Sequence, residues 1–321
     1  MEITVNAALR RWKTTFFTME KLTIVYALVS GLIVVGLWRQ LDDPMRQILA
    51  RIIIVGIIIV LSFSDKLFRN KKFSGFIRVC FQLSLLSYWY PDTYELNKFF
   101  PNLDSLFASL EQSVFGFQPA LDFAPRFPSL WISEAFHLGY FSYYPIICLV
   151  TSYCYFFRPN DFKRFSMLLL GSFFVYYLIY IFLPVAGPQF YFYAIGMKNV
   201  QAANFPAIGD YFRYHRELLP NFHQTDGFFY RLVEMSQKAG ERPTAAFPSS
   251  HVGISTVLTL WLLRNNLKWG FLLIPFYVLL CGATVYIQAH YAIDVLAGWI
   301  TGFLFFGLFY ILPLKKAKIN S

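Results

Sequence analysis

Long apolar stretches separated by shorter polar segments dominate the chain. The hydrocarbon core of a bilayer requires about 20 mostly apolar residues per helix. This criterion predicts eight spans, at 22–38, 48–64, 76–89, 131–157, 165–184, 251–263, 269–288 and 291–313. The second, third and sixth spans are short and borrow polar residues at their ends. We therefore expect an all-α, polytopic membrane bundle of about eight transmembrane helices.

Composition excludes the main soluble classes. Hydrophobic residues make up 57% of the 321 residues and charged residues only 14%, against about 25% in soluble domains. We attribute the net charge of +10 to basic loops that orient the protein in the membrane rather than to nucleic-acid binding. Most Lys and Arg lie on the side of the two termini, and this predicts cytoplasmic termini. Because nothing in the sequence is typical of eukaryotes, we expect a multi-pass protein of the bacterial inner membrane.

Two segments fall outside the predicted spans. Residues 91–129 carry five acids among apolar residues and predict an interfacial or partly re-entrant helix pair on the extracytoplasmic side. Residues 186–248 form a predicted loop rich in Pro, Gly and aromatic residues, which we expect to be a lid or floor for a polar substrate. We divide the chain into an N-terminal helix pair, 1–75, and a six-helix catalytic core, 76–321.

A histidine and an acid stand close together at the start of the last span. Asp294 follows His290 by four residues, and on a helix this spacing places both side chains on one face. A carboxylate bonded to one imidazole nitrogen fixes the tautomer and leaves the other nitrogen free as a nucleophile or base. The alternative is a buried polar pair that locks helix packing.

The sixth span opens with Pro248, Ser249, Ser250 and His251. Exposed N–H groups in the first turn of a helix bind anions, and His251 would face such an anion. A capped helix with an interfacial histidine is the alternative. In the eight-span topology His251 and His290 share the extracytoplasmic face, while Arg158 lies at the opposite face. Two histidines, a carboxylate and a helix N-terminus suit phosphoryl transfer without a metal or another cofactor.

At these residues the chain resembles the type 2 phosphatidic acid phosphatase superfamily. The resemblance covers roughly residues 76–313 and depends on the segments 246–251 and 290–295. It implies that His290 forms a phosphohistidine, Asp294 activates it, and His251 acts first as an acid and then as a base.

The departures from the phosphatase pattern favour a transferase branch. Only three residues separate Lys238 from Arg242, where the phosphatases have six, and Ala283 and Thr284 replace a Ser-Arg pair. The string 290–295 is similar to that of the inositol phosphorylceramide and sphingomyelin synthases. The two extra N-terminal spans and the turn at 184–191 also resemble the inositol phosphorylceramide synthases. The pair Ser249-Ser250 instead resembles the phosphatases.

The resemblance therefore implies a lipid phosphotransferase that moves a phosphoinositol-type head group from a glycerophospholipid to a ceramide-like acceptor. Besides the three catalytic residues, the candidate substrate-binding residues are Ser249, Ser250, Arg242, Lys238 and Gln189. Membrane lipids are the expected partners, with no nucleic acid and no obligate protein partner.

Three other interpretations remain open. The same triad could hydrolyse a lipid mono- or diphosphate. A transporter or lipid-binding scaffold is disfavoured, because the span centres lack charged residues and the sequence lacks inverted repeats.

Glu134 and His137 form one pair at i, i+3. A di-iron site in a helix bundle needs two such pairs, so a metal site is disfavoured. We expect them to contact each other or a substrate head group.

Overall fold

The computed structural model describes residues 16–64, 68, 70–220 and 227–311, and this part of the chain is helical with no strand. The prediction of an all-α membrane bundle is confirmed. The elements are α2 (Thr18–Gly36), α3 (Pro44–Ser62), α4 (Lys71–Ser84), α5 (Leu86–Asn97), α6 (Asp104–Phe115), α7 (Pro119–Arg126), α8 (Leu130–Phe141), α9 (Tyr143–Phe157), α10 (Pro159–Phe182), α11 (Pro188–Ile195), α12 (Met197–Gln201), η2 (Tyr211–Arg213), α13 (Phe228–Gly240), α14 (Ser250–Asn265), α15 (Leu267–Tyr286) and α16 (Ala292–Ile311).

Each of the eight predicted spans coincides with one long helix or with two consecutive helices; the last two residues of span 291–313 lie outside the described part. Within it, α2, α3, α10, α15 and α16 are long and apolar enough to cross a membrane by length and composition. The third span divides into α4 and α5, and the fourth into α8 and α9. Pro145 explains the second break, because proline has no N–H to bond Phe141 and is tolerated only in the first turn of α9.

Close packing of α14 against α16 brings the two predicted catalytic segments together. A Cβ added at Gly298 of α16 would lie 2.7 Å from the Ser249 carbonyl and 2.9 Å from Cβ of Val252. Only glycine allows the two backbones to approach this closely. The start of α14, which carries His251, is thereby held against the start of α16.

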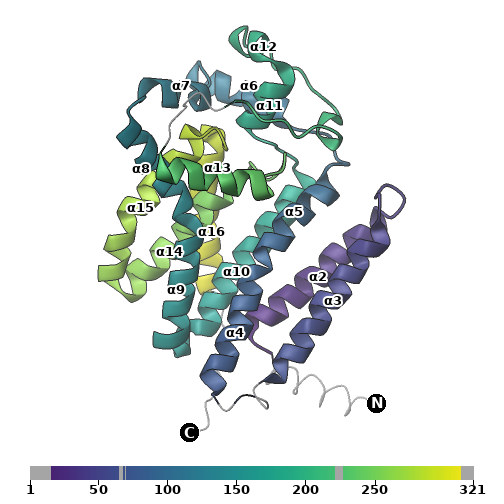
Figure 1. The fold of residues 1–321 in the computed structure, drawn as a ribbon, viewed down its shortest axis with the longest axis vertical. Coiled ribbons are helices and arrows are strands. Elements are labelled where there is room, and N and C mark those ends of the chain that lie inside the picture. The colour runs from purple at the N-terminus through teal and green to yellow at the C-terminus, as the bar shows by residue number, and fades with distance from the viewer. Residues whose placement is uncertain (1–15, 65–67, 69, 221–226, 312–321) are drawn as a thin grey trace.

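The short helices α6, α7, α11 and α12 gather over one end of the bundle, and α13 crosses beside them (Figure 1). This is the end at which α14 and α16 begin. The prediction of a helix pair in 91–129 is confirmed by α6 and α7, but Pro91 lies inside α5, which continues to Asn97. The prediction of a loop over 186–248 is wrong, because α11, α12, η2 and α13 form within it.

Two buried ion pairs join the N-terminal helices to the rest of the bundle. Arg51 of α3 binds Asp92 of α5 at 2.6 Å, and Arg78 of α4 binds Glu20 of α2 at 2.6 Å. Because all four side chains are buried, losing one partner would leave an uncompensated charge. The pair α2–α3 is therefore fixed against α4 and α5, as Figure 1 also shows.

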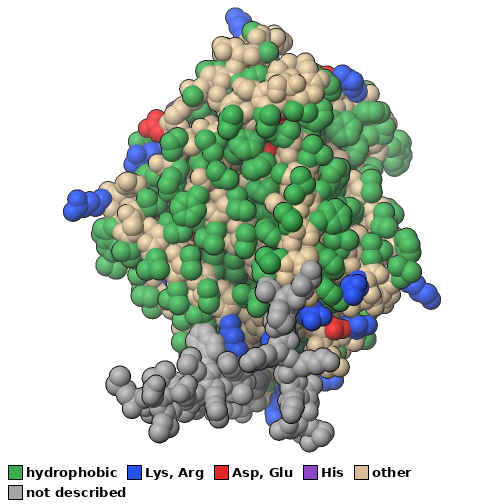
Figure 2. Space-filling view, turned by 180° about the vertical axis from the view of Figure 1, so that it is seen from behind, with side chains coloured by type: hydrophobic (Ala, Val, Ile, Leu, Met, Phe, Trp, Pro, Cys, Tyr) green, Lys and Arg blue, Asp and Glu red, His purple; other side chains and the backbone are tan. Residues whose placement is uncertain are grey.

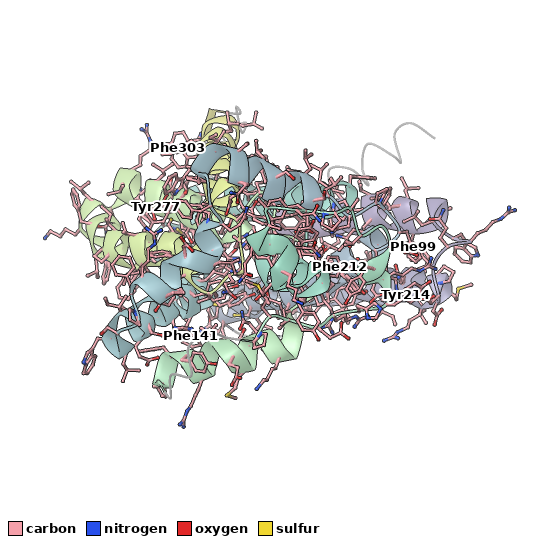
Figure 3. All side chains as sticks on the ribbon, turned by 90° about the horizontal axis from the view of Figure 1, so that it is seen from above. Phe99, Phe141, Phe212, Tyr214, Tyr277 and Phe303 are labelled. Atoms are coloured by element: carbon pink, nitrogen blue, oxygen red, sulfur yellow. The ribbon has the colours of Figure 1, made fainter. Side chains whose placement is uncertain are left out.

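Apolar side chains cover most of the molecule's outer surface seen from behind, with Lys and Arg mainly towards the edges (Figure 2). An apolar groove of about 600 Å³ runs between α15 and α16 and is lined by residues that include Tyr277 and Phe303. Figure 3 places these two residues on the side of the molecule opposite Phe99 and Tyr214. Such a surface suits contact with lipid chains.

Candidate active site

His290 is held by the backbone of a distant loop. It lies in the turn between α15 and α16, and its Nδ1 is 2.8 Å from the Ala246 carbonyl oxygen. A carbonyl can only accept, so Nδ1 carries the proton and Nε2 presents its lone pair. The histidine is only 3% exposed. The Ala246 carbonyl therefore fixes the tautomer that a nucleophilic Nε2 requires.

Two residues in the left-handed region flank this hydrogen bond. Ala245 has φ +68° and Gln288 has φ +64°, a conformation that costs a non-glycine residue of order 1 kcal/mol. Backbone hydrogen bonds hold the chain next to each of these two residues. Ala246 N–H donates to Val185 O at 2.9 Å, and Gln189 N–H donates to Gln288 O at 3.1 Å. The surrounding structure thus enforces an uncommon backbone where His290 is positioned.

Asp294 lies beside His290, but the geometry differs from the predicted helix face. Helix α16 begins at Ala292, after the histidine. The Asp294 Oδ2 atom is 3.6 Å from His290 Nδ1, and it accepts the Tyr291 N–H at 2.8 Å. At 3.6 Å the carboxylate acts on the imidazole through its charge rather than through a hydrogen bond. The carboxylate therefore stabilises a positive imidazole, while Ala246 orients it.

His251 faces His290 from the first turn of α14. Its Nδ1 is 3.4 Å from His290 Nε2. The His251 ring stacks on Tyr140 at a centroid distance of 4.8 Å and contacts Tyr143 at 4.4 Å. The two aromatic rings limit the rotation of the imidazole and keep it beside the free nitrogen of His290. The structure thus brings the three predicted catalytic residues, His251, His290 and Asp294, together.

Most N–H groups at the start of α14 are already bonded within the protein. Ser249 N–H donates to Asp294 O at 3.1 Å, and Ser250 N–H donates to the Tyr180 hydroxyl at 3.0 Å. The Ser249 hydroxyl accepts the Val252 N–H at 3.4 Å, so Ser249 caps the helix. Among the described groups, none accepts the His251 N–H. This N–H is therefore the first-turn donor that remains for an anion.

The surroundings of His290 suit a nucleophile. Burial lowers the pKa of His290 to about 4, and the Ala246 carbonyl and the nearby Glu241 carboxylate oppose that decrease. A neutral imidazole at ordinary pH has the free electron pair that attack on phosphorus requires. A second imidazole within reach can carry the proton for a leaving oxygen. The arrangement can therefore perform phosphoryl transfer by covalent catalysis.

Gln189 belongs to a polar cluster that the sequence pattern did not reveal. Its Nε2 donates to Glu241 Oε1 at 2.8 Å, and its Oε1 accepts from Gln237 Nε2 at 3.4 Å. Gln189 is 5% exposed. Burial raises the pKa of Glu241, against the effects of Gln189 and of nearby His290. Glu241 adjoins the predicted Arg242-Pro243 pair, yet no spacing rule identified it.

The two predicted cations lie in different surroundings. Arg242 donates from Nη1 to the Glu241 main-chain oxygen at 2.7 Å. Lys238 is on the exposed side of α13, where Nζ binds Glu234 at 2.9 Å and the side chain is 70% exposed. The structure therefore keeps Arg242 next to the Gln189–Glu241 cluster and directs Lys238 to the surface.

A buried aspartate connects the short helices over the end of the bundle, α6, α7, α11 and α12 (the cap), to the turn between α15 and α16 that carries His290 (the catalytic turn). Asp104, at the start of α6, is fully buried and accepts from Ala186 N–H, Gly187 N–H, the Tyr291 hydroxyl and Asn102 Nδ2 at 2.6 to 3.0 Å. Tyr291 directly follows His290. Asp104 thus joins the start of α6, the segment between α10 and α11, and the catalytic turn through one carboxylate.

Glu111 binds the start of α16 from one face of α6. Its Oε2 accepts the Ile293 N–H at 3.2 Å, and its Oε1 is buried with no partner among the described groups. Burial raises the pKa of Glu111 to about 8. Glu111 thus binds the first turn of α16 through Ile293, the residue before Asp294.

Glu134 and His137 have structural contacts. The Glu134 carboxylate accepts the N–H groups of Phe229 at 2.8 Å and Tyr230 at 2.9 Å, and so caps α13. His137 Nδ1 is bonded to Ser133 O at 2.7 Å, and its ring packs on Tyr230. In the described part of the chain, no group of three His, Cys, Asp or Glu side chains could hold a metal ion.

The site lies at one end of the bundle, as the predicted topology requires. Arg158 Nη1 donates to Asn265 O at 3.3 Å, at the end of α14 opposite His251. About 14 residues of helix, or roughly 20 Å, separate the two. Arg158 therefore does not share a face with His251.

Comparison with known proteins supplies a family. No curated protein and no solved structure matched the chain. The sequence model of the PAP2 superfamily matches residues 109–308, which is more than half of the chain and includes all three catalytic candidates. The chain therefore belongs to the PAP2 superfamily.

Proposed function

We propose that the protein is a membrane lipid phosphotransferase that moves a phosphoinositol-type head group from a glycerophospholipid to a ceramide-like acceptor. The observation that carries this proposal is the contact of His290 Nε2 with His251 Nδ1, 3.4 Å apart, while Ala246 holds the proton on His290 Nδ1. An unprotonated, nucleophilic nitrogen and a proton carrier are thus adjacent.

In the first step His290 Nε2 attacks phosphorus of the donor phosphodiester. A P–N bond forms, the P–O bond to diacylglycerol breaks, and protonated His251 gives its proton to the departing oxygen. The head group remains on His290 as a phosphohistidine. Asp294, 3.6 Å from Nδ1, stabilises the positive charge that the imidazole acquires.

In the second step the primary hydroxyl of the acceptor attacks phosphorus. His251, now neutral, takes the hydroxyl proton; a P–O bond forms and the P–N bond breaks. His290 is neutral again, and the pair returns to its starting protonation. The His251 N–H and Arg242 are the candidates for holding the phosphate oxygens, and Ser249 and Ser250 shape the helix start that presents this N–H.

The transferase is favoured over the phosphatase by the surroundings of Thr284. Thr284 occupies the position at which the phosphatase pattern places an arginine. It is fully buried, its hydroxyl donates to Cys281 O at 2.9 Å, and its carbonyl accepts the His290 N–H at 3.0 Å. This position therefore supplies no cation for a dianionic phosphomonoester.

The test uses the purified protein with a phosphoinositol glycerolipid and labelled ceramide. The proposal predicts a labelled phosphosphingolipid from the wild type and none from His290→Ala. Release of inorganic phosphate from a lipid monophosphate, with no lipid product, would instead identify a phosphatase. Undiminished turnover in His290→Ala would contradict the phosphohistidine mechanism.

A further inference from the structure

The side chains of Gln237, Gln189 and Glu241 form a continuous hydrogen-bonded row beside the catalytic pair. Gln237 donates to Gln189 at 3.4 Å, and Gln189 donates to Glu241 at 2.8 Å. The row ends in a carboxylate, which can accept further hydrogen bonds.

Backbone bonds fix this row to the turn that carries the nucleophile. Gln189 N–H donates to Gln288 O at 3.1 Å, two residues before His290, and Gln189 O accepts the Leu219 N–H at 2.8 Å. Glu241 is five residues before Ala246, whose carbonyl holds His290. The Glu241 carboxylate also lies close enough to His290 for the two groups to act on each other's charge, so the row lies beside the residue that would carry the phosphorus.

The charge of Glu241 has no cationic partner among the described residues. Arg242 binds the main-chain oxygen of Glu241, and Lys238 pairs with Glu234. A carboxylate without a cation, next to a phosphate site, repels the second negative charge of a phosphomonoester. The same carboxylate accepts hydrogen bonds from hydroxyl groups, and neighbouring amide groups can both donate and accept.

We propose that Glu241, Gln189 and Gln237 form a head-group subsite that binds adjacent hydroxyl groups of a neutral polyol esterified to the phosphodiester. The proposal rests on the proposed function, since it places this polyol on the phosphate that His290 attacks. It adds a specificity: polyol head groups are preferred over phosphomonoesters, which the carboxylate repels. They are also preferred over quaternary ammonium head groups, which have no donor to hydrogen-bond with the row.

Binding of water-soluble head-group probes tests the subsite independently of turnover. Calorimetry would compare glycerophosphoinositol, glycerophosphocholine and glycerol phosphate with the full-length protein in detergent, in a His290→Ala background that cannot react. We expect glycerophosphoinositol to bind most tightly. Glu241→Gln should weaken its binding about 10- to 150-fold, the effect of losing hydrogen bonds to a charged acceptor.

Glu217→Gln is the matched control, because Glu217 is half-exposed in the same segment and pairs with His215. It should bind all three probes as the parent does. If Glu241→Gln proves unstable, Gln189→Met interrupts the same row and should weaken glycerophosphoinositol binding without changing glycerophosphocholine binding.

Equal affinity for the three probes, or an equal loss for all three in Glu241→Gln, would overturn the subsite. Tighter binding of glycerophosphocholine would overturn it in favour of a cationic head group. The transfer assay is an independent test. If the wild type forms labelled phosphosphingolipid, the proposed function is supported even when the binding measurements contradict the subsite.

Discussion

Replacing Asp104 by asparagine tests whether the cap positions the catalytic turn. Each Asp104 oxygen accepts two hydrogen bonds: Oδ1 from Gly187 N–H and the Tyr291 hydroxyl, and Oδ2 from Ala186 N–H and Asn102 Nδ2. Asparagine has nearly the same shape, but its amide nitrogen must replace one of these oxygens. Whichever oxygen is replaced, one buried backbone N–H then faces another donor.

The loss follows from these contacts. A buried N–H without an acceptor costs about 1–3 kcal/mol, and the remaining bonds weaken because their acceptor is no longer charged. We estimate a loss of about 2–5 kcal/mol. For a domain of 150–250 residues each kcal/mol lowers Tm by about 2–4 °C, so Asp104→Asn should melt at least about 4 °C lower. Transfer should also fall, since Tyr291 adjoins His290.

Thermal unfolding in detergent and transfer by the same preparation measure both effects. The matched control is Asp122→Asn, because Asp122 is 43% exposed and pairs with Arg126 within α7. Such exposed pairs contribute about 0.3–0.5 kcal/mol, so this variant should behave as the wild type. If Asp104→Asn melts within 1 °C of the wild type and transfers at full rate, the positioning role is wrong.

Three further predictions concern the charged groups of the site. Asp294→Asn should lower kcat by up to about 10,000-fold in a single-turnover transfer assay; near-normal turnover would exclude a catalytic role for this carboxylate. Because the pKa of His290 is lowered to about 4 and the nucleophile must be neutral, the acid limb of kcat/KM should appear only as pH drops towards 4; an acid limb near 6.5 would contradict this. The pKa of Glu111 is raised to about 8, so the folded state binds the extra proton and stability should decrease as pH rises from about 4.5 to 8. Glu111→Gln should flatten that part of a Tm-against-pH curve, and an unchanged curve would refute the assignment.

Spacing and hydropathy predicted the apolar helices and the grouping of His251, His290 and Asp294. Each of the eight apolar stretches coincides with one helix or two consecutive helices, and in the described part of the chain five helices are long and apolar enough to cross a membrane. Burial in a bilayer imposes a length that is visible in the sequence. His251, His290 and Asp294 were recognisable because ionisable residues are rare near the spans of this chain. The family resemblance also depends on two short segments, 246–251 and 290–295, which can be recognised without knowledge of the fold.

The partners of those residues could not be predicted. The Ala246 carbonyl that fixes the His290 tautomer has no side-chain signature, and no motif spacing distinguishes Asp104 or Glu241 from the other acids of their segments. Asp104 lies 187 positions before Tyr291, the residue whose hydroxyl it binds. Only the tertiary fold brings such positions together. The five acids in 91–129 were the available signal, since buried carboxylates imply distant donors.

In the proposed mechanism His290 carries the head group between two lipids. The most direct measurement is mass spectrometry of lipids formed by the purified protein from a phosphoinositol glycerolipid and isotope-labelled ceramide. The wild type should form labelled phosphosphingolipid and an equal amount of diacylglycerol, and His290→Ala should form neither. Free phosphate from a lipid phosphate as the sole product, or the same lipid product from His290→Ala, would contradict it.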